Sequence, residues 1–164
     1  MSNIYEGKTA IIINIDHTVR TTISGQFYIT EPGDSKLVTT SLPILAALHG
    51  HGYTVIGVSM QPNLSQHSYD LGSYLACFEI LQESLGEISF DQLYFNQHVT
   101  WDFKDTRCIT LALKDFRLGR RSCLYVGVTD SEAVLCKVLG IPFINALEFF
   151  QRIPFRMEIE KLYF

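Results

Sequence analysis

Residues 9 to 18, TAIIINIDHT, decide the fold of this chain. The segment from Thr9 to Ile15 is a β-branched apolar run. It is too short for a helix and too continuous for a half-exposed strand, a pattern typical of a parallel strand buried on both faces. Asn14 stands near its end, and Asp16, His17 and Thr18 follow directly. We therefore expect a central strand that carries a polar cluster at its carboxyl end.

Working outward, apolar runs alternate with amphipathic segments along the rest of the chain. Residues 19 to 40 mix β-formers with Ser-Gly and Pro-Gly pairs, which predicts a small hairpin flap. Helices are predicted at 42–52, with Ser41 as the cap, and at 109–116 and 131–139, the last ending at Gly140. A fourth helix, 68–85, should face the core through Leu71, Leu75, Phe78 and Leu81. Strands are predicted at 53–59, which should be buried, at 93–95, which is short, at 122–128, which is apolar, and at 142–145.

This alternation predicts a three-layer α/β fold with a doubly wound, mostly parallel sheet and no large cap domain. The chain has 164 residues, of which 47% are hydrophobic and 18% charged, so it is long and apolar enough for a single domain spanning residues 1–164. The tail, about residues 147–164, is rich in aromatic side chains. It has two open interpretations, packing on its own sheet or forming a docking or oligomer surface for a protein partner.

Charge and cysteine usage narrow the function classes. The formal net charge of −4 provides no positive field for a nucleic-acid backbone, so nucleic acid is not expected as a partner. The four cysteines are widely spaced in apolar runs and are interpreted as reduced core thiols. No signal-like start and no apolar stretch of about 18 residues is visible. We therefore expect a cytoplasmic protein without a membrane segment.

Three polar clusters follow three predicted strands. They are Asn14 to Thr18, then Ser59 with Gln61, then residues 127–132 (GVTDSE). The carboxyl ends of parallel strands lie at one edge of a sheet, where ligands of such folds bind. Candidate functional chemistry is therefore expected at this edge.

Over residues 8 to 146 the chain resembles the haloacid dehalogenase (HAD) superfamily, and within it the small uncapped histidinol-phosphate and heptose-bisphosphate phosphatases. Asn14, Asp16 and Thr18 stand at the three places of the first motif, Asp-x-Asp-x-Thr. Ser59 and Gln61 match the second motif. The resemblance implies a phosphate site made by these residues.

The remaining motifs match less fully. Lys104 is the better match to the third-motif lysine, because a predicted helix follows it, and Lys114 is the alternative. In the fourth motif, Val128 occupies the place of the first acidic residue and Glu132 that of the second. Asp130 is a nearby carboxylate that could serve instead.

Two departures from the family pattern affect the chemistry that the resemblance implies. In the family the first Asp attacks phosphorus and binds Mg²⁺, whereas Asn14 is neutral and a poor nucleophile. Val128 removes a second carboxylate, so the site should bind Mg²⁺ poorly. His17 also replaces a usual glycine. The segment before Lys104 retains only His98 of the subgroup's zinc loop, so no zinc is expected.

The sequence thus predicts a degenerate HAD-like domain, a pseudoenzyme that acts as a binding or scaffolding module and needs no cofactor. Loss of a nucleophile costs about 10⁶ in kcat in a well-studied protease, which would reduce a typical kcat to about 10⁻⁵ s⁻¹. Two alternatives stay open. One is an active Mg²⁺-dependent phosphomonoesterase on a small phosphorylated metabolite, with Asp16 as general acid/base. The other is a sensor that binds a small anion or phosphorylated metabolite without turnover.

Overall fold

The computed structural model describes residues 7–27, 29, 31–60, 71–96 and 106–152. In this part of the chain a five-stranded sheet in the order β5-β4-β1-β6-β7 forms the centre, and every pair in it is parallel. The strands are β1 (Ala10–Asn14), β4 (Thr54–Met60), β5 (Gln92–Asn96), β6 (Cys123–Gly127) and β7 (Phe143–Asn145). The α/β fold with a mostly parallel sheet is therefore confirmed.

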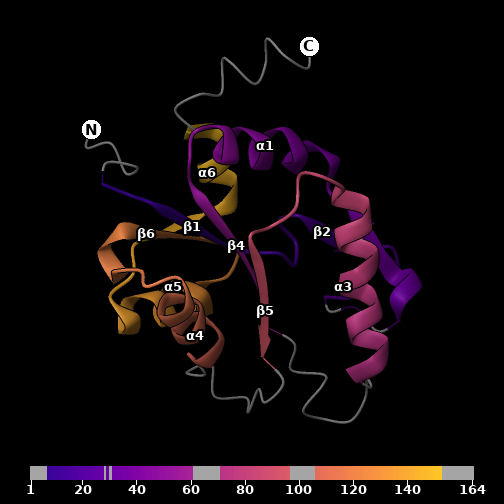
Figure 1. The fold of residues 1–164 in the computed structure, drawn as a ribbon. Coiled ribbons are helices and arrows are strands. Elements are labelled where there is room, and N and C mark those ends of the chain that lie inside the picture. The colour runs from indigo at the N-terminus through magenta and orange to yellow at the C-terminus, as the bar shows by residue number, and fades with distance from the viewer. Residues whose placement is uncertain (1–6, 28, 30, 61–70, 97–105, 153–164) are drawn as a thin grey trace.

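Helices cover both faces of this sheet (Figure 1). One face packs against α1 (Leu42–Gly50), α3 (Leu71–Leu85) and α6 (Ala146–Arg152). The other packs against α4 (Arg107–Asp115) and α5 (Asp130–Leu139). Single 3₁₀ turns stand at Pro32–Asp34, Thr39–Ser41 and Arg120–Ser122.

Strand β1 is buried on both sides, as its sequence predicts. Ile11 and Ile13 contribute to the core under α1 and α3, whereas Ala10 and Ile12 contribute to the core under α4 and α5. This alternation follows from the two-residue period of a strand. Because β1 lies between β4 and β6, its carboxyl end is surrounded by the ends of two other buried strands.

The predicted flap contains a small antiparallel sheet. Strands β2 (Arg20–Thr22) and β3 (Ser35–Leu37) pair so that Arg20 lies opposite Leu37. Ser24 donates from its backbone and its hydroxyl to the buried Asp34 carboxylate, at 2.6 and 2.8 Å. The hairpin is thus closed by side-chain hydrogen bonds as well as by its strands.

Two sequence predictions about the helices are wrong. Leu71 and Leu75 are 43% and 42% exposed, whereas Phe78 and Leu81 are buried as predicted. Helix α3 also buries Tyr74, Cys77 and Leu85. Ser41 makes no capping hydrogen bond, because its backbone is already helical and its hydroxyl donates to the Val38 carbonyl at 2.6 Å. Gly140 does end α5, in the left-handed conformation with φ 70°.

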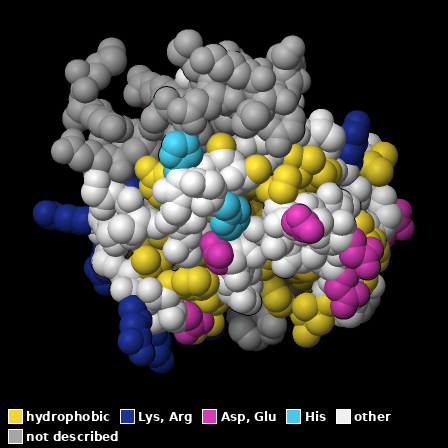
Figure 2. Space-filling view, turned by 45° about the horizontal axis from the view of Figure 1, so that its top comes forward, with side chains coloured by type: hydrophobic (Ala, Val, Ile, Leu, Met, Phe, Trp, Pro, Cys, Tyr) yellow, Lys and Arg dark blue, Asp and Glu magenta, His cyan; other side chains and the backbone are white. Residues whose placement is uncertain are grey.

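Among the described residues, no helix combines the length and the hydropathy that spanning a bilayer requires. Figure 2 shows that the side chains on the face toward α1 are mixed, with several separate hydrophobic groups among polar and acidic ones. In the tail, Phe149 is fully buried in the core, so at least this aromatic residue packs on its own sheet.

Candidate functional site

The site begins at the tight turn that follows β1. The Ile15 carbonyl accepts hydrogen bonds from the amides of Val19 and Arg20, both at 3.0 Å, and the His17 amide donates to the Arg20 carbonyl at 2.7 Å. These bonds fold the chain back on itself within six residues. As a result, Arg20 at the start of β2 lies beside Asp16.

His17 adopts the backbone conformation that favours glycine, with φ 61°. The turn geometry is therefore compatible with the glycine that the resemblance leads one to expect. The imidazole packs against the Phe27 ring with ring centroids 4.4 Å apart and the ring planes tilted by 40°, and its Nε2 lies 2.6 Å from the Phe27 carbonyl oxygen. The side chain thus ties the turn after β1 to the flap.

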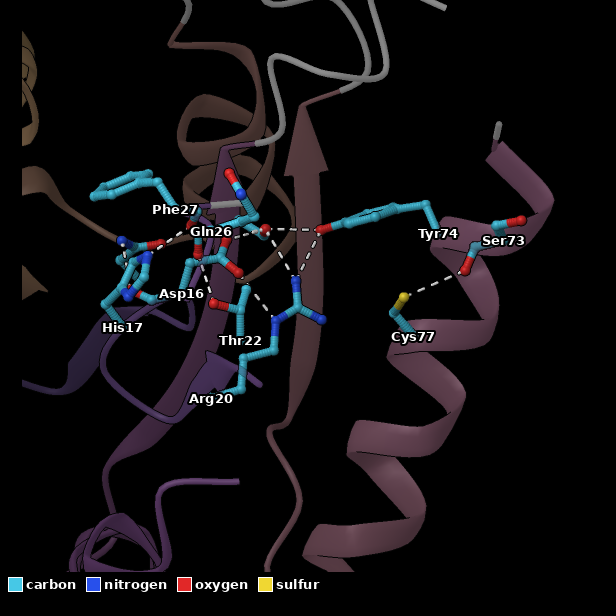
Figure 3. A network of polar contacts seen from close by, with 11 residues as sticks. Asp16, His17, Arg20, Thr22, Gln26, Phe27, Ser73, Tyr74 and Cys77 are labelled. Atoms are coloured by element: carbon cyan, nitrogen blue, oxygen red, sulfur yellow. Dashed lines mark hydrogen bonds and ion pairs between the residues drawn. The ribbon is translucent and has the colours of Figure 1, made fainter. Parts of the chain in front are cut away.

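Asp16 and three other side chains, each from a different segment, form a closed ring of hydrogen bonds (Figure 3). Arg20 Nε donates to Asp16 Oδ1 at 2.9 Å, and the Ser59 hydroxyl donates to Asp16 Oδ2 at 2.5 Å. Tyr74 of α3 donates to Ser59 Oγ at 2.7 Å and accepts from Arg20 Nη2 at 3.3 Å. We call Asp16, Arg20, Ser59 and Tyr74 the Asp16 ring.

The register of the sheet explains why these residues meet. Asn14 of β1 lies beside Val58 of β4, so the chain just after β1 reaches the level of Ser59. Helix α3 packs on the face of the sheet that α1 and α6 also cover, and it brings Tyr74 toward Ser59. The convergence of Asp16 and Ser59 at the carboxyl edge follows the sequence prediction.

The Asp16 ring is closed off from solvent. Arg20 is 1% exposed, Asp16 7% and Ser59 0%. The Arg20 guanidinium carbon lies 5.2 Å from the centre of the Phe78 ring and 5.8 Å from that of Tyr74, within the range of cation–π attraction.

The ring also sets the protonation of its members. Burial by itself lowers the pKa of Arg20, but the Asp16 carboxylate reverses this and holds the pKa above its ordinary value. Burial, followed by the Asp16 charge, raises the pKa of Tyr74 well above its usual range. The guanidinium therefore stays charged and the phenol stays neutral at physiological pH.

Asn14, at the place of the family nucleophile, turns its amide nitrogen inward. Nδ2 donates to the backbone carbonyl of Asp16 at 3.2 Å, and the side chain is buried. If the side-chain amide were flipped, Asn14 Oδ1 would face the Asp16 carbonyl oxygen, so this hydrogen bond fixes which end of the amide carries the nitrogen. Asn14 Oδ1 and Thr18 Oγ1 are buried and have no hydrogen-bond partner among the described residues.

Glu132 is fully engaged in the start of α5. Its Oε2 accepts from the amides of Val128 and Thr129 at 3.0 and 2.9 Å and from the Thr129 hydroxyl at 2.9 Å. Its Oε1 accepts from the buried Tyr125 hydroxyl at 3.0 Å. With Thr129 it forms a capping box, which satisfies amides at the helix start. Glu132 is thus a structural carboxylate.

Among the described residues, the side chains at the metal positions of the family do not fit the magnesium ion that the resemblance implies. Mg²⁺ needs near-octahedral oxygen ligands. Asn14 presents N–H groups toward the Asp16 carbonyl, Val128 has no oxygen in its side chain, and Glu132 is held in the capping box. Asp130 is exposed at the first turn of α5. No group of three or more His, Cys, Asp or Glu side chains with metal-site geometry occurs in the part of the chain that was described.

Not every predicted site residue can be placed. Gln61, Lys104 and His98 lie outside the described residues, while Lys114 is on α4. Conversely, the sequence reasoning missed Arg20 and Tyr74. A signal for Tyr74 was present, because it shares the helical spacing of Phe78, Leu81 and Leu85. Arg20 had only a weak signal, as a cation between the β-branched residues Val19 and Thr21, just after the polar cluster at Asn14 to Thr18.

Comparison with known proteins supports the fold. No protein-family model matches the sequence, and no curated protein does. A HAD-like protein of Mesorhizobium loti superposes with a TM-score of 0.66 at 19% identity, over 82% of this chain and 69% of its own. D,D-heptose 1,7-bisphosphate phosphatase from B. bronchiseptica, solved with magnesium and phosphate, gives 0.66 at 14% identity over 82% and 77%.

The chain has the fold of the HAD-like phosphatases. A third match has the same character, since the cobalt-bound deoxy-D-mannose-octulosonate 8-phosphate phosphatase of Haemophilus influenzae gives a TM-score of 0.56 at 11% identity, over 87% of this chain and 71% of its own. At these identities the likeness concerns the fold. The chemistry has to be argued from the residues at the carboxyl edge.

Proposed function

We propose that this chain is a HAD-like domain that does not catalyse phosphoryl transfer and acts as a binding or scaffolding module. The observation that carries the proposal is the buried Asn14 amide, which donates to the Asp16 carbonyl from the place of the nucleophile. In the mechanism that the HAD resemblance implies, the nucleophile is the ionised carboxylate at this position, and an amide offers no lone pair of comparable basicity.

The surroundings of Asn14 support the same proposal. Asp16, the residue at the general acid/base place, has one oxygen paired with Arg20 and the other hydrogen-bonded to Ser59. A general acid must reach the leaving group of a substrate. An Asp16 held inside a sealed ring has its carboxylate directed at protein groups, so the ring serves structure and charge balance.

The proposal is tested by measuring phosphatase turnover with Mg²⁺ over a broad panel of phosphorylated metabolites. The expected rate lies far below the ordinary enzyme range, and turnover above about 0.1 s⁻¹ contradicts the proposal. Asn14→Ala serves as the control, because activity that this variant retains unchanged does not depend on the residue at the nucleophile place.

Binding without turnover remains the second candidate, favoured by the buried Thr18 hydroxyl and Asn14 Oδ1, which have no partner among the described residues. Buried polar groups in proteins are usually hydrogen-bonded, so a ligand or water could complete both. Calorimetry with inorganic phosphate and with sulfate separates a sensor from a scaffold. Measurable affinity supports the sensor, and its absence supports a scaffold.

A further inference from the structure

Helix α5 carries two valines on its solvent side. The helix covers the same face of the sheet as α4 and turns Leu135 and Leu139 toward the core (Figure 1). Val134 and Val138, by contrast, are 62% and 67% exposed. Because residues four apart are neighbours on a helix surface, these two side chains form one apolar patch.

Valine is an unfavourable residue for a helix position in water. Its branched side chain is restricted in a helix, and Ala, Lys, Gln and Glu all have higher helix propensities. Single exposed apolar side chains are common on protein surfaces, but an adjoining pair on one helix face is a candidate contact surface. The patch on α5 is therefore expected to be buried against another surface.

The charged residues around the patch indicate what that surface is. Asp130 lies in the first turn of α5 and Lys137 in the last, and both are exposed. Neither forms an ion pair with another described residue. They are two turns apart on the same side of the helix, about 10 Å along its axis, so they are too far apart to pair within one α5.

We propose that the outer face of α5, made by Asp130, Val134, Lys137 and Val138, is a self-association surface that binds α5 of a second copy of this chain. In an antiparallel pair of these helices, related by a two-fold axis, Asp130 of each copy lies level with Lys137 of the other. A parallel pair would place like charges opposite each other, so the charges select the antiparallel arrangement. This inference goes beyond the proposed function, because it concerns a surface outside the Asp16 ring.

The size of this surface predicts a weak dimer. Helix α5 has 10 residues. A helix of this length spans about 15 Å, and one such pair buries less than the roughly 1,200 Å² of a standard interface, so the contact belongs to the transient class. Valines from both copies form the centre of the contact and the charged residues form its rim, as in other protein interfaces.

The association is measured by sedimentation velocity of the natural chain over a wide concentration range, up to about 1 mM, where weak dimers become populated. We expect a monomer–dimer equilibrium. Val134→Ser with Val138→Ser should raise the Kd about 10-fold or more, because four valines leave the contact while serine keeps a similar helix propensity. Leu147→Ser is the matched control, because Leu147 is 68% exposed on α6, on the other face of the sheet, and its loss should leave the Kd unchanged.

Two charge variants test the antiparallel pairing. Lys137→Glu leaves only acidic side chains at this face and Asp130→Lys leaves only basic ones, so each variant alone should associate more weakly than the natural chain. An equimolar mixture of the two should associate at least about 10-fold more tightly than either alone, because both ion pairs are restored between unlike copies. Since all the substituted side chains are exposed, each variant is expected to fold, and circular dichroism checks this.

A natural chain that stays monomeric throughout the concentration range overturns the inference and leaves the α5 face to a different protein partner. An unchanged Kd in the valine variant, or a mixture of charge variants that associates no better than its components, also overturns it. The latter result assigns Asp130 and Lys137 to the helix dipole alone. Phosphatase turnover by the natural chain contradicts the proposed function and leaves these association measurements to decide the role of α5.

Discussion

Removing the charge of Arg20 should destabilise the protein strongly, and Arg20→Met isolates that charge. Methionine keeps an unbranched chain that can still pack against Phe78 and Tyr74. The change leaves the Asp16 carboxylate, 7% exposed, without the guanidinium 2.9 Å from its Oδ1. Breaking a buried pair by removing one partner costs about 3–5 kcal/mol. In a chain of this length each kcal/mol lowers Tm by about 2–4 °C, so the expected fall is about 6–20 °C.

The assay is urea unfolding followed by circular dichroism, with Arg20→Met, Asp16→Asn and the double variant compared in one cycle. The double variant should lose less than the sum of the single losses, with a coupling of about 1–3 kcal/mol. Lys36→Met is the matched control, because Lys36 is an exposed cation on the partner strand β3 and its loss should change stability by at most about 0.5 kcal/mol. An Arg20→Met cost within about 1 kcal/mol of that control would refute the buried-pair reasoning.

Three further outcomes are expected. Gly127→Ala should lower the free energy of unfolding, measured by urea titration, by about 1–3 kcal/mol, because the added Cβ would lie 2.9 Å from the Glu132 carboxyl group. Gly33→Ala is the control and should be nearly neutral, because nothing lies within 4 Å of its Cβ position. Equal effects of the two variants contradict the close packing at Gly127. Glu132→Ala should cost about 1–3 kcal/mol by leaving amides at the start of α5 unpaired, and an unchanged midpoint speaks against the capping role. The free energy of unfolding should fall as pH rises above about 9, because burial raises the pKa of Cys136 to about 12 and that of Tyr74 further still. In the unfolded chain these side chains then lose protons that they keep in the native state. A constant free energy of unfolding between about pH 8 and 10.5 contradicts this prediction.

The fold was largely predictable because its strongest signals are local. The run from Ile11 to Ile13 is apolar on every residue and too short for a helix, a pattern typical of a strand buried on both faces. Gly140 marks the end of α5 through a backbone conformation that favours glycine. The register of parallel strands then brings Asp16 and Ser59 to one edge without further information from the sequence.

The parts that were missed depend on contacts between segments. Leu71 and Leu75 were expected to face the core, but α3 turns Tyr74 toward the sheet because the buried polar ring offers partners for its hydroxyl. The pairing of Arg20 with Asp16 needs the tight turn at His17, which no helix or strand periodicity encodes. The capping box of Thr129 and Glu132, by contrast, has a local signal, because the two residues have the Thr-x-x-Glu spacing of this motif.

The most direct test of the account is a crystal structure of the natural chain grown with Mg²⁺ and a phosphate mimic. The account predicts Asn14 Nδ2 still donating to the Asp16 carbonyl, Arg20 still paired with Asp16, and no octahedral ion beside them. An ion bound at about 2.1 Å from Asn14 Oδ1, with ordered waters completing an octahedron, would contradict it.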